Sequence, residues 1–252
     1  MTPEQFAQKK AEEEIEACDF SGLEKQLAEM RARFKPMSEE EYQKRTWDKI
    51  IVPELETLGI PSEHRKKIEK WGNTAQEKVF REVRGICQLK QGSIVALVGN
   101  RGTGKTTIPI QIMRERAEYW HKFYNATSAE RQGWEAPLDR GMYIKLLRLS
   151  SMFKPMFADF GTTQTVLPEL LENWSRVPLL VIDELHEVDD LKTTYRFLTD
   201  LLDRRYGNKV PTVIISNHSG EQFTKTLNPS CLSRISQYGK IIECKWKSWR
   251  NR

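Results

Sequence analysis

Cysteine is scarce in this sequence, and its spacing excludes several kinds of site. The 252 residues include four cysteines, Cys18, Cys87, Cys231 and Cys244, and no two of them stand two residues apart. A zinc knuckle or a redox dithiol needs that close pair, and a disulfide scaffold needs a much higher cysteine content. We therefore expect reduced, intracellular cysteines that mostly pack in the core.

Long apolar runs are missing as well. The longest, such as residues 94–98, contain about five residues, far fewer than the roughly 20 that span a bilayer. The first ten residues, MTPEQFAQKK, lack the apolar core of a secretory signal. These absences predict a soluble, cytoplasmic protein that does not enter a membrane.

Glycine and proline are limited to 14 and 11 residues, whereas 38% of the residues are apolar and 30% are charged. This balance excludes collagen and disorder throughout the chain. A chain of this length can form one full core and a small additional region.

Positive charge is concentrated in the later part of the chain. Residues 1–85 contain 16 Lys and Arg against 18 Asp and Glu, whereas residues 86–252 contain 24 against 17. An excess of this size suits a polyanionic partner, and it fits an ordinary solvated surface equally well.

The beginning of the chain has helical periodicity. Residues 4–34 are rich in Glu, Lys, Gln and Ala, and apolar residues recur at steps of three and four, namely Phe6, Ile15, Leu23, Leu27, Met30 and Phe34. This pattern predicts two amphipathic helices joined by a turn around Asp19–Gly22. The narrow apolar stripe either packs on the main domain or docks on another protein. Residues 36–72 contain repeated Pro and Gly and are interpreted as a linker with short helices.

From Ile86 onward, apolar strands alternate with polar helices, which is typical of a parallel sheet covered on both faces. The expected strands are Ser93–Val98, Met142–Leu147, Leu179–Ile182, Thr212–Ser216 and Lys240–Cys244. We therefore expect an α/β domain with a five-stranded parallel sheet.

The first expected strand leads into a phosphate-binding loop. Residues 99–106, GNRGTGKT, match G-x-x-x-x-G-K-[ST] between a strand and a helix. Small residues let backbone N–H groups surround a phosphate at a helix N-terminus. In this pattern Lys105 contacts the β and γ phosphates and Thr106 binds Mg²⁺. The predicted nucleotide-binding residues are Gly99, Asn100, Arg101, Gly102, Thr103, Gly104, Lys105, Thr106 and Thr107.

Two further strands end in residues that can complete an ATP hydrolysis site. Asp183 and Glu184 follow an apolar strand, so Asp183 can hold the metal through water and Glu184 can polarise an attacking water. Asn217 follows another strand, where its amide can orient water and touch the γ phosphate. Each of these residue types is also common where a strand meets a turn or a helix.

Arg234 stands after an expected helix and before the last strand, where a guanidinium can reach a nucleotide held by a neighbouring subunit. An arginine supplied in this way stabilises transition-state charge and makes hydrolysis depend on assembly. A surface pair with an acidic residue explains the same position.

Taken together, these motifs resemble the AAA+ ATPases of the DnaC/IstB group, the bacterial and phage helicase loaders and transposition helpers. The resemblance covers about residues 75–250 and rests on five segments, 181–185, 203–206, 211–219, 232–235 and the ending 247–250. It implies an AAA+ core with Walker A at Lys105 and Thr106, Walker B at Asp183 and Glu184, sensor 1 at Asn217 and an arginine finger at Arg234. Arg250 matches the family's closing arginine.

The resemblance also implies a division of the chain and its partners. Residues 1–70 are expected to form a helical partner-binding region with a linker, and residues 71–252 the ATPase domain. The implied ligands are ATP and Mg²⁺. The implied partners are a hexameric replicative helicase, single-stranded DNA and further copies of the chain in a ring or spiral.

Candidate nucleic-acid contacts follow the second expected strand. Lys145, Arg148 and Lys154 with Phe153 combine cations with an aromatic ring, a combination that tracks and stacks a single strand. An apolar strand that continues into an amphipathic helix explains them too. At the level of the whole protein, the alternatives are a transposition helper that binds duplex DNA and a nucleotide-switched DNA-binding module with little turnover. A small-molecule kinase is disfavoured because no arginine-rich lid segment is found.

Overall fold

The computed structural model describes residues 41, 47–68, 70–89, 92–133, 141–145, 160–185 and 191–248. It divides the chain into two units, Met1–Trp47 and Asp48–Arg252, and the second unit contains nearly all of the described residues. The two helices expected over 4–34 lie outside the described residues. Within these ranges, none of the helices has the length and apolar character needed to cross a bilayer.

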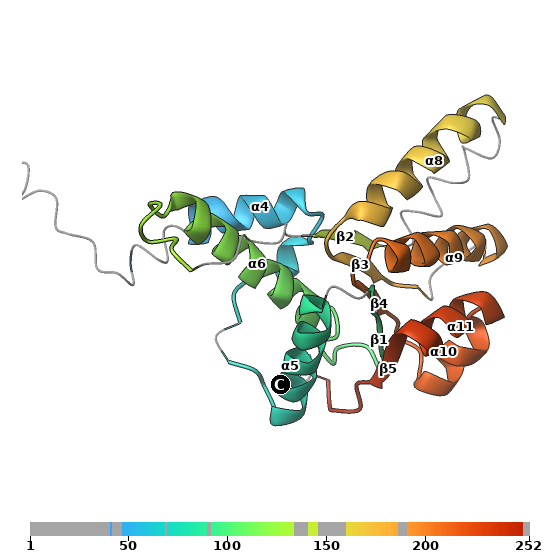
Figure 1. The fold of residues 1–252 in the computed structure, drawn as a ribbon. Coiled ribbons are helices and arrows are strands. Elements are labelled where there is room, and N and C mark those ends of the chain that lie inside the picture. The colour runs from blue at the N-terminus through green and yellow to red at the C-terminus, as the bar shows by residue number, and fades with distance from the viewer. Residues whose placement is uncertain are drawn as a thin grey trace, which may run out of the picture. The chain divides into compact units, whose positions relative to one another are not determined.

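The second unit is built on a five-stranded parallel sheet (Figure 1). The strands are β1 (Ile94–Val98), β2 (Met142–Lys145), β3 (Leu180–Asp183), β4 (Thr212–Ile215) and β5 (Gly239–Glu243), in the order β2-β3-β4-β1-β5. β1 lies between β4 and β5: its Ile94 is opposite Thr212 of β4 and Gly239 of β5. The predicted α/β class and parallel sheet are confirmed, and most strand bounds shift by only one or two residues.

Short helical segments begin the described part of this unit. They are a π-helix at Trp47–Ile51, α4 (Val52–Thr57) and a 3₁₀ turn at Ser62–His64. Ile51, Leu55 and Ile60 are buried, and the Tyr143 backbone N–H donates to the Leu58 carbonyl at 2.9 Å. This stretch of the expected linker therefore packs into the same unit as the sheet.

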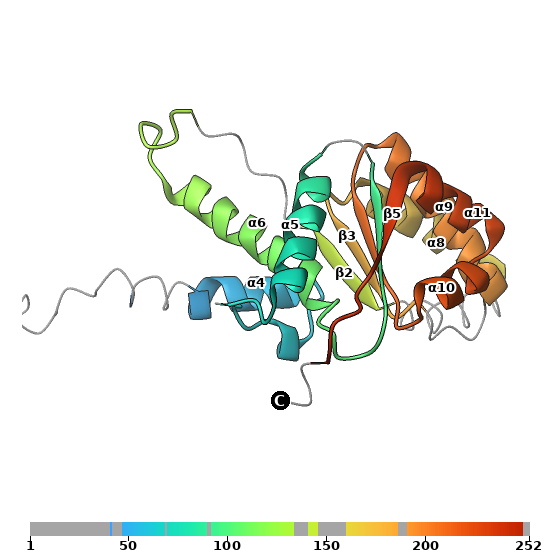
Figure 2. The same ribbon diagram turned by 90° about the horizontal axis from the view of Figure 1, so that it is seen from below.

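Helices cover both faces of the sheet (Figure 2). One face carries α5 (Thr74–Gln88) and α6 (Thr107–Asn125), which pack on each other. The other carries α8 (Phe160–Arg176), α9 (Leu191–Gly207), α10 (Gly220–Thr226) and α11 (Pro229–Tyr238), with α9 between α8 and α11. Because both faces are covered, the strands β1, β3 and β4 are buried along their whole length.

Side-chain caps fix the starts of α5, α10 and α11. Asn73 caps α5 by accepting the Gln76 N–H at 2.7 Å. Ser219 and Gln222 form a reciprocal capping box at the start of α10, four residues after β4 ends. Asn228 caps α11. The Ser219 cap fixes the segment that follows β4 at the carboxyl ends of the strands, where parallel α/β sheets bind ligands.

Candidate functional site

The phosphate-binding loop occupies the turn between β1 and α6, as the sequence predicted. Gly99 has φ 130° and Gly104 has φ 80°, backbone conformations that favour glycine. A Cβ on Gly99 would lie 2.8 Å from the Cys244 carbonyl oxygen, and one on Gly104 would lie 2.4 Å from Gln76 Nε2. The glycines therefore let the loop pass close to β5 and α5.

Lys105 is buried at the base of this loop, with 4% of its surface exposed. Its Nζ donates to the carbonyls of Gly99 and Asn100 at 2.7 Å each. Burial lowers the pKa of the Lys105 ammonium, and the nearby Asp183 carboxylate acts in the opposite direction. The ammonium thus lies in a poorly solvated position next to a cavity, which suits contact with a phosphate.

Side chains from α5 and from the segment after β5 are hydrogen-bonded to the phosphate-binding loop. The Trp246 indole Nε1 donates to the Thr103 carbonyl at 2.6 Å, and Gln76 Nε2 lies 3.4 Å from the same oxygen. The loop start is tied to the segment after β4, because the Gly99 N–H donates to the His218 carbonyl at 2.7 Å. Sequence reasoning missed these contacts, since neither Gln76 nor Trp246 belongs to a recognisable motif.

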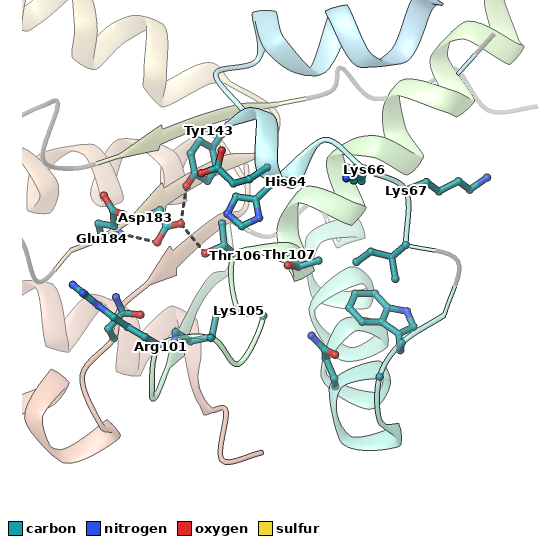
Figure 3. Close-up of a pocket in the computed structure, with 18 of the residues that line it drawn as sticks. His64, Lys66, Lys67, Arg101, Lys105, Thr106, Thr107, Tyr143, Asp183 and Glu184 are labelled. Carbon is teal, nitrogen blue, oxygen red and sulfur yellow. Dashed lines mark hydrogen bonds between the residues drawn. The ribbon is translucent and has the colours of Figure 1, made fainter. Parts of the chain in front are cut away.

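The acidic strand end lies against the loop. Asp183, the last residue of β3, is 6% exposed, and its Oδ2 accepts the Thr106 hydroxyl at 2.9 Å (Figure 3). Hydroxyl and carboxylate oxygens are ligands that Mg²⁺ prefers, together with phosphate oxygens and water. The two residues predicted to hold the metal are therefore adjacent, although 77 positions separate them in the sequence.

Glu184 and Asn217 border the same cavity. Glu184 has φ 62°, an uncommon conformation for a residue with a side chain, and its Oε1 lies 3.0 Å from Lys145 Nζ in an ion pair. Asn217 follows β4, next to His218, whose carbonyl holds the loop start. The structure thus brings together four of the five predicted catalytic residues: Lys105, Asp183, Glu184 and Asn217.

The cavity has a volume of about 750 Å³, within the range of small-molecule sites. One wall is the phosphate-binding loop with the ends of β2 and β3. The opposite wall comes from the segment before α5, including His64, Lys66, Lys67, Ile68 and Trp71. Trp71 packs on Phe80 of α5 with ring centroids 4.6 Å apart. Sequence analysis interpreted this segment as a linker. A cluster of cations and one tryptophan were the sequence features that could have indicated its place in the cavity wall.

Arg234 lies outside this cavity, on α11. Its guanidinium pairs with Asp203 of α9, with Nη2 3.2 Å from Oδ2. The side chain is one-third exposed. Arg234 therefore does not line the cavity of its own chain. Its role at a neighbouring subunit stays a prediction.

The predicted nucleic-acid residues are only partly described. Lys145 lies in the cavity wall, where it pairs with Glu184, so its observed partner is one of the predicted catalytic residues. Its contact with nucleic acid stays a prediction. Arg148, Phe153 and Lys154 lie outside the described residues, as does Arg250.

The cysteines described here agree with a packing role. Cys87, Cys231 and Cys244 are buried and free, and burial raises the pKa of their thiols to about 12, 11 and 12 respectively. In the described part of the chain, no group of three or more His, Cys, Asp or Glu side chains is arranged to hold a metal ion.

Comparison with known proteins places this site in context. No protein-family model matches the chain. Over 180 residues it is 28% identical to the replicative helicase loader DnaC of Escherichia coli K12, an alignment that covers 70% of this chain. The chain is similar to the DnaC helicase loaders. The aligned part spans 65% of the DnaC length, slightly less than two-thirds.

Solved structures agree at the level of the fold. The crystal structure of DnaI has a TM-score of 0.51 and 18% identity, and the match covers 73% of this chain and 94% of that one. The crystal structure of the DnaC helicase loader has a TM-score of 0.50 and 18% identity, covering 69% and 92%. The predicted α/β fold with a five-stranded parallel sheet and the predicted resemblance to the DnaC loaders are therefore confirmed.

Proposed function

We propose that this chain is a Mg²⁺-dependent ATPase that loads a hexameric replicative helicase onto single-stranded DNA. The observation that carries the proposal is the contact between Thr106 Oγ1 and Asp183 Oδ2 at 2.9 Å, beside the buried Lys105 ammonium. A loop that served only as a turn would not require the Thr106 hydroxyl to lie against the buried Asp183 carboxylate. The similarity to DnaC supports helicase loading as the purpose of hydrolysis.

The cavity residues divide the chemical work among them. ATP would supply the transferable γ-phosphoryl group, and a bound Mg²⁺ would neutralise charge on the phosphate oxygens. Lys105 and the loop N–H groups would bind phosphate, and Thr106 with Asp183 would hold the metal. Glu184 polarises the attacking water once it leaves Lys145, and Asn217 orients that water. All five residues belong to the loop or lie at or just after the ends of buried strands, so their backbone is fixed before the ligand binds, and of the five only Glu184 is proposed to exchange its side-chain partner.

Arg234 is proposed to act on the ATP of a neighbouring subunit in a ring or spiral. Its pairing with Asp203 supports this role, because the pair holds the guanidinium at a partly exposed position that does not border the protomer's own cavity. Residues 1–70 are proposed to hold the helicase, and residues 71–252 to form the ATPase domain. Lys145, Arg148, Phe153 and Lys154 are proposed to contact the single strand.

The role of Arg234 can be tested by mixing two inactive variants. Arg234→Ala removes the finger but keeps Glu184, whereas Glu184→Gln removes the base but keeps the finger. Neither variant alone should hydrolyse ATP, and their mixture should recover activity, since some interfaces then combine an intact base with an intact finger. Arg204→Ala is the matched control, because Arg204 pairs with Asp200 on the same helix. No recovery in the mixture would place the finger elsewhere.

Loading itself is tested by size-exclusion chromatography of the full chain with a candidate hexameric helicase, ATP and single-stranded DNA. Glu184→Gln should trap an ATP-bound assembly that contains the helicase. A preference for duplex DNA without helicase binding would instead select the transposition helper. Normal loading by Glu184→Gln would select a nucleotide switch without required turnover.

A further inference from the structure

Three hydrogen bonds fix the buried carboxylate of Asp183. Its Oδ1 accepts the backbone N–H of Glu184 at 2.7 Å. Its Oδ2 accepts two hydroxyl groups, from Thr106 at 2.9 Å and from Tyr143 at 2.7 Å. The Glu184 contact follows from chain adjacency, and the Thr106 contact follows from the phosphate-binding loop. The Tyr143 contact comes from a separate strand and belongs to no motif recognised in the sequence.

Strand pairing explains how Tyr143 reaches this carboxylate. In the parallel pair β2 and β3, Tyr143 lies opposite Val181 and Lys145 lies opposite Asp183. Alternate residues of a strand point to the same face, so Tyr143 shares a face with Val181 and Asp183. The Tyr143 side chain is buried, at 4% exposure, and its backbone N–H is held by the Leu58 carbonyl at 2.9 Å. Both ends of the residue are therefore fixed.

We propose that Tyr143 is a positioning residue of the magnesium site, which fixes the rotation of the Asp183 carboxylate through its hydroxyl. This inference rests on the proposed ATPase function. Both hydroxyl donors occupy Oδ2, whereas Oδ1 accepts one hydrogen bond among the described residues. A carboxylate oxygen can accept about two, so Oδ1 keeps a lone pair for the metal or its water. A hydroxyl that binds a cation through its oxygen still has a proton to donate, so the Thr106 contact is compatible with bound metal.

A second tyrosine shows that ring burial alone does not explain the Tyr143 contact. Tyr195 of α9 is also buried, at 6% exposure, and its hydroxyl has no hydrogen-bond partner in the described ranges. Among the described residues, this fold therefore buries one tyrosine whose hydroxyl has no hydrogen-bond partner and one whose hydroxyl donates to Asp183. Tyr195→Phe is a matched control for Tyr143→Phe, because both changes remove a single buried hydroxyl.

The experiment measures magnesium dependence separately from nucleotide affinity. Binding of a fluorescent ATP analogue to the full chain is measured first in EDTA and then along a Mg²⁺ titration. Tyr143→Phe should keep its affinity in EDTA within about twofold of the original protein, since the loop and Lys105 are unchanged. Its half-saturating Mg²⁺ concentration should rise about tenfold, the effect of one lost hydrogen bond to a charged group. Tyr195→Phe should titrate like the original protein.

A coupling measurement tests whether Tyr143 acts through Asp183. Asp183→Asn should weaken the response to Mg²⁺, and adding Tyr143→Phe to it should cause no further change, because the positioned group is already lost. An additive tenfold change would overturn the positioning role. So would a Tyr143→Phe protein that has a lower melting temperature but an unchanged Mg²⁺ titration, because that result describes a structural tyrosine.

The same data separate this inference from the proposed function. If the original protein binds the nucleotide with no response to Mg²⁺, or does not bind it, the ATPase proposal fails. If the original protein responds to Mg²⁺ and both Phe variants respond identically to it, only the role of Tyr143 fails.

Discussion

The two ends of the sheet each carry a hollow of similar size, with different chemistry. The cavity at the carboxyl ends of the strands measures about 750 Å³, and the hollow at the amino ends about 730 Å³. The first is bordered by the phosphate-binding loop and by the carboxylates of Glu63, Asp183 and Glu184. The second is bordered by the starts of β1 and β5, by two lysines, and by Tyr206 and Tyr238, whose rings stack with centroids 3.5 Å apart.

Helix direction adds to this difference. The N-terminus of α6 follows the phosphate-binding loop, whereas α5, α9 and α11 end beside the amino-end hollow, which their residues Ile86, Gly207 and Tyr238 help to line. A helix N-terminus attracts anions and a C-terminus repels them. Cavity volume alone therefore does not identify the nucleotide site. The site is identified by the direction of the neighbouring helix and by polar side chains from several strands that are hydrogen-bonded to one another.

Buried cations at the two ends provide a second comparison. Arg205 is fully buried near the amino ends. It donates to the carbonyls of Trp174, Val177 and Pro211 at 2.5–2.8 Å and to Thr212 Oγ1 at 2.7 Å. Burial lowers the pKa of this guanidinium to about 9, so it stays charged at pH 7. Lys105 also donates to carbonyls but borders a cavity that contains carboxylates. We interpret Arg205 as structural and Lys105 as functional.

The largest expected effect comes from Arg205→Met. The change leaves buried carbonyls without donors, so it should lower the free energy of unfolding by about 3 kcal/mol, measured by urea denaturation. At a temperature where the variant is folded, its nucleotide affinity should match that of the original protein. The neighbouring exposed change Arg204→Met should cost less than about 0.5 kcal/mol. Loss of nucleotide binding in folded Arg205→Met protein would break the assignment of the amino end to stability alone.

Next in size is Lys105→Ala. Removing the ammonium should weaken ATP binding about 100-fold, which corresponds to about 2.7 kcal/mol, measured by calorimetry. Lys209→Ala removes a cation from the amino-end hollow and is the matched control. It should bind ATP like the original protein. Equal losses in both variants would mean that net charge, and not the geometry of the loop, controls binding.

The sequence predicted the carboxyl end better than the rest of the molecule. The loop, the acidic strand end and Asn217 are local patterns whose chemistry requires fixed residue types, and each follows an expected strand of a parallel sheet, whose carboxyl ends share one edge. The five parallel strands were predicted for the same reason, since runs such as Ile94–Val98 are apolar throughout. Boundaries shifted because strand ends depend on pairing: Asp183 lies opposite Lys145, which the sequence alone does not reveal.

Contacts between distant segments could not be predicted. Tyr143 reads as one more apolar strand residue, and its hydroxyl finds Asp183 only after β2 pairs with β3. Residues 51–60 were interpreted as part of a linker because Pro and Gly recur over residues 36–72, yet Leu55 and Ile60 are fully buried. The burial of a side chain depends on what the rest of the chain places around it, and that information is not local.

A smaller effect is expected from Ser219→Ala, which lies at the functional end but acts on stability. Ser219 accepts the Gln222 N–H at 3.2 Å in the α10 capping box, and losing a cap costs about 1 kcal/mol. Thermal denaturation measures this loss. Nucleotide affinity should stay within about twofold, because Asn217 is also held through the Gly99 contact with His218. A larger loss of affinity would show that the capping box itself fixes the site.

The smallest effect is expected from Leu89→Ser in the amino-end hollow. Leu89 is half exposed, so the change removes little buried apolar surface and should alter the free energy of unfolding by less than about 0.5 kcal/mol. ATP binding should be unchanged, because the residue lies at the opposite end of the sheet from the loop. Measurement of both quantities in one preparation keeps them comparable. Reduced helicase binding or ATPase activity in this variant, with normal stability, would mean that the amino end also has a function. The two hollows would then differ in the ligand that each binds.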